Sequence, residues 1–406
     1  MRLVLVLVCA LALQGFLALY FGPTYHGRDD RVYIQLAGQM VEQAWTMQNG
    51  GWIHRWAIAL PTALSLRVFP GSPRAPWIWP LICSLMTTAM VWGIARKTIG
   101  NREAGVAAIL LALSPIHLRQ STTLVPEPIL ACAMLVLAWS LYHRHRGCAW
   151  FVVAALAWWF GFVAKIAIVW TCPFVALLWV YDVFVLRYHK GRSWTPFFIV
   201  LFSGGFVLSC VYWVARGDAF SWLTTGLCYG QSRPGLASMA HEWALLQRLT
   251  YEPFIVLFSP FYAYLVFFGV AALVLLFLKN YVPLGCAGLI CENENPSFWV
   301  AFFACALAAF WFSSTSLSAY IPIKANPRYM FVFVPWLALF AGIGLVGLRD
   351  YYEDLWCMPL LVRCWWIPFL ALAIYAGWVG YYGEDYIRFV GRDGAPWSPA
   401  GPNPML

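Results

Sequence analysis

Two adjacent carboxylates, Asp29 and Asp30, follow the first apolar run of the chain, which covers about residues 3–21. They open a segment, Asp29–Trp45, whose pattern predicts an amphipathic helix lying on a membrane surface. A carboxylate beside a membrane can act as a general base on an acceptor that attacks a lipid-linked sugar. The alternative is structural, because Asp at a helix start caps backbone N–H groups and favours the helix dipole. We assign catalysis to Asp29 and leave Asp30 open between a capping and a supporting role.

Other charged and aromatic side chains stand at the ends of apolar runs, where they could bind the phosphate of such a sugar donor. A leaving phosphate gains negative charge in the transition state and needs cationic partners. Arg offers bidentate contacts and Lys a point charge. Charges at membrane depth are costly and usually mark a site. The candidate substrate-binding residues are Tyr33, His54, Arg55, Arg119, Glu127, Lys165, Arg328 and Tyr329.

Ordinary structural roles compete with binding at three of these positions. Glu127 precedes Pro128 and could cap the helix that follows. Lys165 could extend its ammonium group to the membrane interface. Arg328 could be an interfacial anchor of the kind common in membrane proteins. The sequence leaves these alternatives open.

The elements that must position these residues are membrane helices. The chain has 406 residues, of which 62% are hydrophobic and only 11% charged, and this composition excludes a soluble domain. An apolar run of about 20 residues spans a bilayer, and such runs recur along the whole sequence. The net charge of +9 fits positive cytoplasmic loops and outer arginines that bind anionic ligands, and we expect no nucleic-acid partner.

We predict an all-α polytopic membrane protein with about eleven spans. Lys- and Arg-rich short loops belong to the cytoplasm, which places the N-terminus inside. One membrane domain is expected over residues 1–382, with a first outer loop at 22–76 and a second at 216–253. Two interfacial amphipathic helices, Asp29–Trp45 and Trp52–Phe69, lie in the first loop, and residues 383–406 form an irregular Pro/Gly-rich tail. The spans after the first are predicted near residues 77–96, 104–116, 128–142, 149–164, 166–186, 194–215, 254–278, 297–313, 329–348 and 360–381.

The sequence gives little support for a metal site or for disulfides. Most of the 12 Cys residues lie inside apolar runs without CxxC spacing, so they are expected to be small hydrophobic residues. We predict no metal ligands and no resident cofactor, while a divalent cation stays compatible with the sequence. Asp182 lies near the inner end of its span and is expected to meet Arg187 or solvent.

Several of these residues fall into an ordered set of motifs. The first outer loop carries Asp29-Asp30-x-x-Tyr33-x-x-x-Ala37, and His54-Arg55-Trp56 follows it. A Ser114-Pro115 segment then precedes Glu127, Lys165 follows an apolar run, and Pro327-Arg328-Tyr329 opens a late span. In this order the motifs resemble those of the GT-C membrane glycosyltransferases, in particular the group of aminoarabinose transferases and protein O-mannosyltransferases. Two departures are the absence of the paired prolines that usually follow the His, and Glu127 where Asp is common.

The resemblance implies a helical membrane fold with interfacial helices over a lipid-facing cavity at the extracytoplasmic face of the cell inner or plasma membrane. It implies that Asp29, the first carboxylate of the pair, lies at the reacting centre of an inverting transfer. The donor would be a polyprenyl-phosphate-linked sugar, and the acceptor would be a lipid, a glycan or a protein.

Two other functions remain alternatives on the sequence. One is a polytopic transporter or flippase of lipid-linked sugars, and the other is a non-catalytic assembly protein. A transporter is expected to show inverted repeats with charges near the membrane midplane. No such symmetry is visible, and the unusual charges are predicted at one face.

Overall fold

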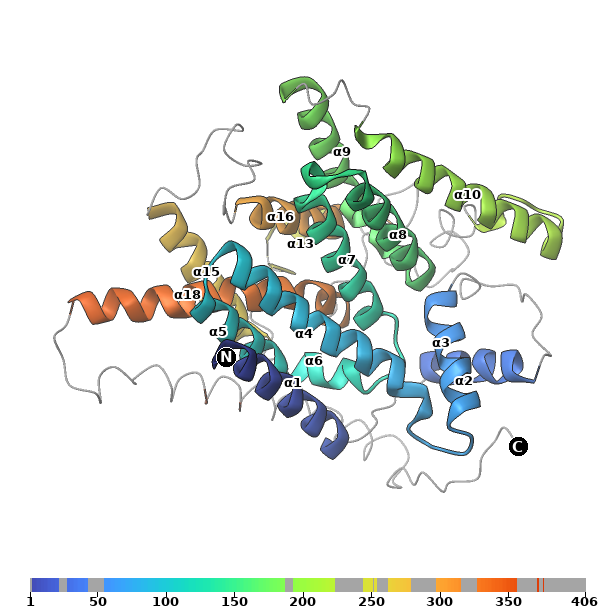
Figure 1. The fold of residues 1–406 in the computed structure, drawn as a ribbon, viewed down its shortest axis with the longest axis horizontal. Helices are drawn as coiled ribbons and strands as arrows, with labels where there is room; N and C mark the ends of the chain where they lie inside the picture. The colour runs from blue at the N-terminus through green and yellow to red at the C-terminus, as the bar shows by residue number, and fades with distance from the viewer. Residues whose placement is uncertain are drawn as a thin grey trace.

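The structure, a computed structural model, describes residues 2–21, 28–42, 55–186, 193–222, 244–250, 252–253, 262–278, 297–314 and 327–355, together with residues 371 and 375. The described part is built from helices that cross one another at varied angles (Figure 1). This architecture confirms the predicted all-α polytopic membrane fold.

The first half of the chain holds the helices that carry most candidate residues. Short 3₁₀ turns join several of them: Ala75–Trp77 leads into α4, Arg144–Arg146 separates α7 from α8, and Ile166–Thr171 leads into α9. A π-helical turn, Tyr181–Val185, continues α9. The helices are α1 (Arg2–Phe21), α2 (Arg28–Val41), α3 (Trp56–Val68), α4 (Ile78–Thr98), α5 (Asn101–Ala112), α6 (Pro115–Ser121), α7 (Glu127–Tyr142), α8 (Cys148–Ala164), α9 (Cys172–Val180) and α10 (Thr195–Arg216).

The second half contributes the helices that complete the core. A 3₁₀ turn, Phe331–Phe333, joins α17 to α18. The helices are α13 (Ala244–Leu249), α15 (Ala263–Leu278), α16 (Ser297–Phe312), α17 (Pro327–Met330) and α18 (Val334–Leu355).

Four helical stretches within the described residues are long and apolar enough to cross a membrane: Ala75–Thr98, Ile166–Val185, Thr195–Ala215 and Phe331–Arg349. Shorter apolar helices stand where most of the other spans were predicted. The count of eleven spans stays a prediction, and the last predicted span, 360–381, lies almost wholly outside the described residues.

Two predicted elements differ from the structure. The span expected at 104–116 ends with α5 at Ala112, because Ser114 is extended and Pro115 opens a new helix, α6. The helix expected as amphipathic at Trp52–Phe69 is α3, which is apolar on both sides. It buries Ala57 and Ile58 while exposing Leu60 and Leu64.

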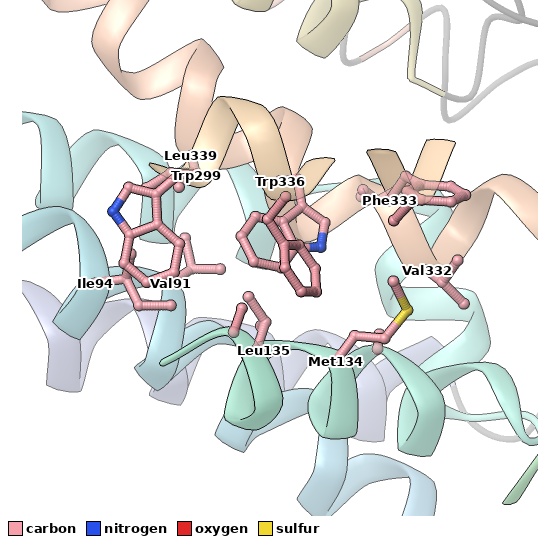
Figure 2. Packing of buried hydrophobic residues seen from close by; sticks show 14 of the residues in the cluster. Val91, Ile94, Met134, Leu135, Trp299, Val332, Phe333, Trp336 and Leu339 are labelled. Atoms are coloured by element: carbon pink, nitrogen blue, oxygen red, sulfur yellow. The ribbon is translucent and has the colours of Figure 1, made fainter. Parts of the chain in front are cut away.

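The core lies where α4, α7, α16 and α18 meet (Figure 2). Trp299 of α16 and Trp336 of α18 are fully buried there, with ring centroids 6.0 Å apart. Val91 and Ile94 come from α4, and Leu135 from α7. Aromatic rings bury large areas and fix their mutual orientation, so this cluster sets how the helices that carry the candidate site stand against one another.

Two glycines let α18 approach its neighbours closely. A Cβ atom on Gly344 would overlap the backbone carbonyl oxygen of Phe268 in α15. A Cβ atom on Gly342 would come within 2.8 Å of the backbone oxygen of Glu103 in α5 and 2.9 Å of the Cβ of Ala107. Small residues permit this close packing of membrane helices. The contact of α18 with α15 and α5 is therefore made backbone against backbone.

Candidate functional site

The acidic pair lies at the start of α2, which is amphipathic as predicted. Asp30, Tyr33 and Ala37 follow one another at helical spacing and are each fully buried, while Arg31 and Gln35 on the other side are exposed. Asp29 stands in the first turn of α2, and its side chain lies outside the described part of the chain. The first turn of a helix favours negative charge, which suits an ionised carboxylate at this position.

A hydrogen bond joins the two helices of the first predicted outer loop. Arg55, which immediately precedes α3, donates from Nη1 to the hydroxyl oxygen of Tyr33 in α2. Its guanidinium carbon also lies 5.6 Å from the centre of the Tyr33 ring. His54 lies outside the described residues. Tyr33 and Arg55, two predicted substrate-binding residues, are therefore in direct contact.

A buried ion pair joins two further candidate residues. The Nζ atom of Lys165 lies 2.8 Å from Oε1 of Glu127; the Glu127 side chain is fully buried and that of Lys165 is 14% exposed. Glu127 opens α7, and Lys165 follows α8 in an extended conformation before the 3₁₀ turn at Ile166. Because α7 and α8 are consecutive helices packed side by side, the start of one meets the end of the other.

Tyr329 connects this ion pair to α17, in the later part of the chain. The ammonium of Lys165 lies 4.3 Å from the centre of the Tyr329 ring, a distance typical of a cation–π contact. Tyr329 belongs to α17, next to Arg328, whose side chain lies outside the described part. The late Pro-Arg-Tyr motif and the membrane-embedded Lys therefore meet in space.

One apolar cluster places α2 beside the ion pair. The cluster contains Tyr33 of α2, Ile58 of α3, and Leu124 and Ile129 on either side of Glu127. Ala164, which directly precedes Lys165, completes it. Asp30 stands one helical turn before Tyr33. The helix of the acidic pair and the ends of α7 and α8 are thus parts of one packed unit.

Two residues of α6 have different surroundings. Arg119 lies in the last turn of α6 and is partly buried. His117 is fully buried and stacks on Phe331, with ring centroids 5.6 Å apart. Its Nε2 atom is 3.4 Å from the hydroxyl of Thr88, which donates to Gln14. His117 therefore packs into the core between α1, α4 and the turn before α18.

A second ion pair lies at the opposite ends of α7 and α8. Arg144 binds both carboxylate oxygens of Asp182, at 2.8 Å and 2.9 Å, and Trp194 donates to the same group at 2.9 Å. Both charged side chains are 1% exposed. Asp182 was expected to meet Arg187 or solvent. It is closed off from solvent and pairs with Arg144, while Arg187 lies outside the described residues. Sequence analysis missed this pair, whose members are 38 positions apart.

The described residues contain no group of three His, Cys, Asp or Glu side chains that could hold a metal ion. His54 and the side chain of Asp29 lie outside them, so the metal prediction stays a prediction. The cysteines in the described part are free thiols: Cys9, Cys83, Cys132, Cys148, Cys172, Cys210 and Cys305.

Residues 53–214 match the sequence profile of the dolichyl-phosphate-mannose-protein mannosyltransferase family. The matched range contains Arg55, Arg119, Glu127 and Lys165, whereas the acidic pair lies before it. No curated protein matches the chain.

Solved structures give a broader match. The apo oligosaccharyltransferase of Archaeoglobus fulgidus aligns over 98% of this chain and 58% of its own, with a TM-score of 0.57 and 14% identity. Apo ArnT from Cupriavidus metallidurans aligns over 86% of this chain and 61% of its own, with a TM-score of 0.54 and 13% identity. Both neighbours are GT-C membrane proteins. The chain has the GT-C fold.

The GT-C resemblance read from the motifs is therefore confirmed at the level of fold, and the chain is an integral membrane protein. It spans about three-fifths of the length of the first two neighbours. ArnT bound to undecaprenyl phosphate is also similar, with a TM-score of 0.53 and 13% identity, over 95% of this chain and 72% of that one. One of the structures similar to this chain was therefore solved with a polyprenyl phosphate bound.

Proposed function

We propose that this chain is a membrane glycosyltransferase that moves a sugar from a polyprenyl-phosphate donor to a lipid, glycan or protein acceptor. The observation that carries the proposal is the Glu127–Lys165 ion pair, covered by Tyr329 and packed beside the helix of Asp29 and Asp30. Charges at membrane depth are costly and usually functional. The mannosyltransferase match over residues 53–214, and similar structures solved with undecaprenyl phosphate or with dolichol-phosphate and an inhibitory peptide, support the same reaction class.

The donor phosphate is expected to bind beside Lys165. An ammonium group carries three N–H donors, and Glu127 holds the group in place while part of the side chain stays exposed. The ion pair is neutral as a unit, so further cations must balance the phosphate. We assign Arg328, next in the chain to Tyr329, as the main one, with Arg119, Arg55 and His54 as further contacts. Tyr33 then acts by orienting Arg55.

Asp29 is the proposed general base of an inverting reaction. It takes the proton of the acceptor hydroxyl or amine while the acceptor atom forms a bond to the anomeric carbon. The bond between that carbon and the phosphate oxygen breaks, and its electron pair leaves with polyprenyl phosphate, stabilised by the nearby cations. The reaction needs no covalent enzyme intermediate. Asp30, which is fully buried, is assigned a supporting role.

We place the site at the extracytoplasmic face of the cell inner or plasma membrane, because the Lys- and Arg-rich short loops lie at the other ends of the helices. Single Cys residues at Met47 and Ser193 test this placement. Labelling with a membrane-impermeant reagent should modify the Met47 position from outside and the Ser193 position from inside. Labelling of both from one side would overturn the topology.

The proposed reaction is tested by incubating the purified protein with a panel of polyprenyl-phosphate sugars and a cell-envelope extract that supplies lipid, glycan and protein acceptors, with released polyprenyl phosphate as the readout. At least one donor should be consumed by the wild type. Asp29→Asn should slow release by about a hundredfold or more, whereas the matched variant Asp218→Asn should not, because Asp218 is exposed after α10 and caps a turn there. Retention of every donor by a protein that still binds polyprenyl phosphate would refute the proposal.

A further inference from the structure

A group of cations and aromatic rings gathers at the end of α4 and in the turn between α7 and α8. Lys97 of α4 places its Nζ atom 3.4 Å from Nε2 of His143 and 5.3 Å from the ring centre of Trp139. Lysine can only donate, so Nε2 of His143 must be the acceptor and its Nδ1 carries the proton. Arg146 ends the same turn and is exposed, as is Lys97.

His143 forms the floor of this group. It is buried, and its ring contacts Trp139, Tyr142 and Trp150 at centroid distances of 4.4, 5.0 and 5.1 Å. Burial, together with the charges of Lys97 and Arg146, lowers the pKa of His143 to about 4. The imidazole is therefore neutral at pH 7 and adds no third positive charge to the group.

Lys97 and Arg146 lack a carboxylate partner among the ion pairs of the described residues. They differ in this from Arg144, two positions before Arg146, whose charge is neutralised by Asp182. Two like charges held near each other repel, and an anion bound between them removes that cost. Both exposed cations are therefore available to an anionic ligand.

The position of the group identifies the kind of anion. Glu127 and His143 stand at opposite ends of α7, which has 16 residues and a length of about 24 Å. The cations therefore lie at the membrane face opposite the candidate site, at the level of lipid headgroups, where Trp and Lys commonly sit. α8 begins two residues after Arg146 and exposes Val153 and Leu156, which offer apolar surface to an acyl chain.

We propose that Lys97 and Arg146 bind the phosphate of an anionic phospholipid from this opposite leaflet, with His143 as the floor and Trp139 and Trp150 as the walls of the headgroup site. Lys and Arg near a membrane surface recognise anionic headgroups by charge-assisted hydrogen bonds. The site is separate from the proposed donor site and does not depend on the glycosyltransferase assignment.

Native mass spectrometry of the purified full-length protein in detergent tests the site. The protein is titrated with phosphatidylglycerol or with phosphatidylcholine of the same acyl chains, and the dissociation constants are compared. The wild type should prefer phosphatidylglycerol. The double variant Lys97→Gln/Arg146→Gln should bind it roughly thirtyfold more weakly, from the typical contribution of two surface cations. Lys97→Arg should keep the preference, since the charge remains.

The matched control is Arg96→Gln/Arg102→Gln, which removes two exposed cations near the same end of α4 and leaves the group intact. Arg96 lies over the ring of Trp92, whereas the contact with His143 is made by Lys97. The control should keep the phosphatidylglycerol preference. Equal weakening in both double variants would show diffuse surface attraction and overturn the proposal. Displacement of the lipid by an excess of inorganic phosphate alone would also overturn it, because it would identify a site for free phosphate.

Discussion

The two ends of the α7–α8 pair each hold an ion pair with the same shortest distance of 2.8 Å, yet the two differ in exposure. Arg144 and Asp182 are both sealed and bound through two parallel hydrogen bonds, with Trp194 donating to the carboxylate as well. Lys165 keeps part of its side chain exposed beside Glu127 and Tyr329. A fully buried, bidentate ion pair stabilises the packing of the helices, whereas a partly exposed cation can still bind a ligand. Breaking each pair should therefore have different consequences.

The largest expected effect concerns Asp29, the base that we place beside the Glu127–Lys165 pair. Asp29→Asn keeps size and capping ability but removes basicity, so turnover should fall by about 10²–10⁴-fold while donor binding persists. Turnover at saturating donor, together with a separate donor-binding measurement, checks this. Near-normal turnover of Asp29→Asn with an inactive Asp30→Asn would move the base to Asp30. Full activity of both variants would refute the mechanism.

The sealed pair should affect stability rather than reaction rate. Asp182→Asn leaves the buried Arg144 without its countercharge, which should cost about 3–5 kcal/mol of unfolding free energy. Thermal unfolding in detergent measures the loss, and turnover per folded molecule should stay unchanged. Glu127→Gln is the comparison, since Lys165 can turn toward solvent; it should lose less stability and more activity. The reverse pattern would show that the Glu127–Lys165 pair is the one that stabilises the fold.

Removing the cations of the proposed donor site should have a smaller effect. A hydrogen bond to a charged group contributes roughly 1.5–3 kcal/mol, so Lys165→Ala and Arg328→Ala should each lower kcat/KM for the donor by about tenfold to a hundredfold. Arg96→Ala, a cation at the other end of the helices, serves as the control. Donor kinetics equal to wild type in both test variants, with normal expression, would exclude these residues from the site.

The smallest effect is expected at the Tyr33 hydroxyl, which receives the hydrogen bond of Arg55. Tyr33→Phe keeps the buried ring and removes only this acceptor, at a cost of about 1 kcal/mol or roughly fivefold in donor kcat/KM. Tyr20→Phe, an exposed tyrosine in α1, gives the background for such a change. If loss of the hydroxyl changes thermal stability but not donor kinetics, Tyr33 has only a structural role, in packing α2 against α3.

The helices were largely predictable because apolar runs and interruptions are local signals. The start of α7 at Glu127 and the end of α8 at Ala164 lie within a residue of the predicted bounds. The break at Ser114-Pro115 was also visible in the sequence, yet the surrounding apolar residues led to a single predicted span. Proline at the first position of a new helix explains why the structure divides it.

Contacts between residues far apart in the sequence were harder to predict from the sequence. Glu127 and Lys165 were both singled out, but their contact spans 38 positions and depends on how α7 packs against α8. For Asp182 the sequence suggested only Arg187 or solvent, whereas the structure pairs it with Arg144, which is 38 positions away. Sequence indicates which charges need partners, and tertiary packing selects the partners.

The glycine contact of α18 has a consequence for redesign of this chain. Arg328 and Tyr329 lead through one 3₁₀ turn directly into α18, so the depth of that motif in the bilayer is set by where α18 is held. Gly344 lies about 22 Å farther along the helix than this motif and packs against the backbone of α15. A side chain there would shift the whole helix and carry the motif with it. Attempts to change donor preference can therefore vary the residues around Lys165 and Tyr329, but position 344 admits only glycine.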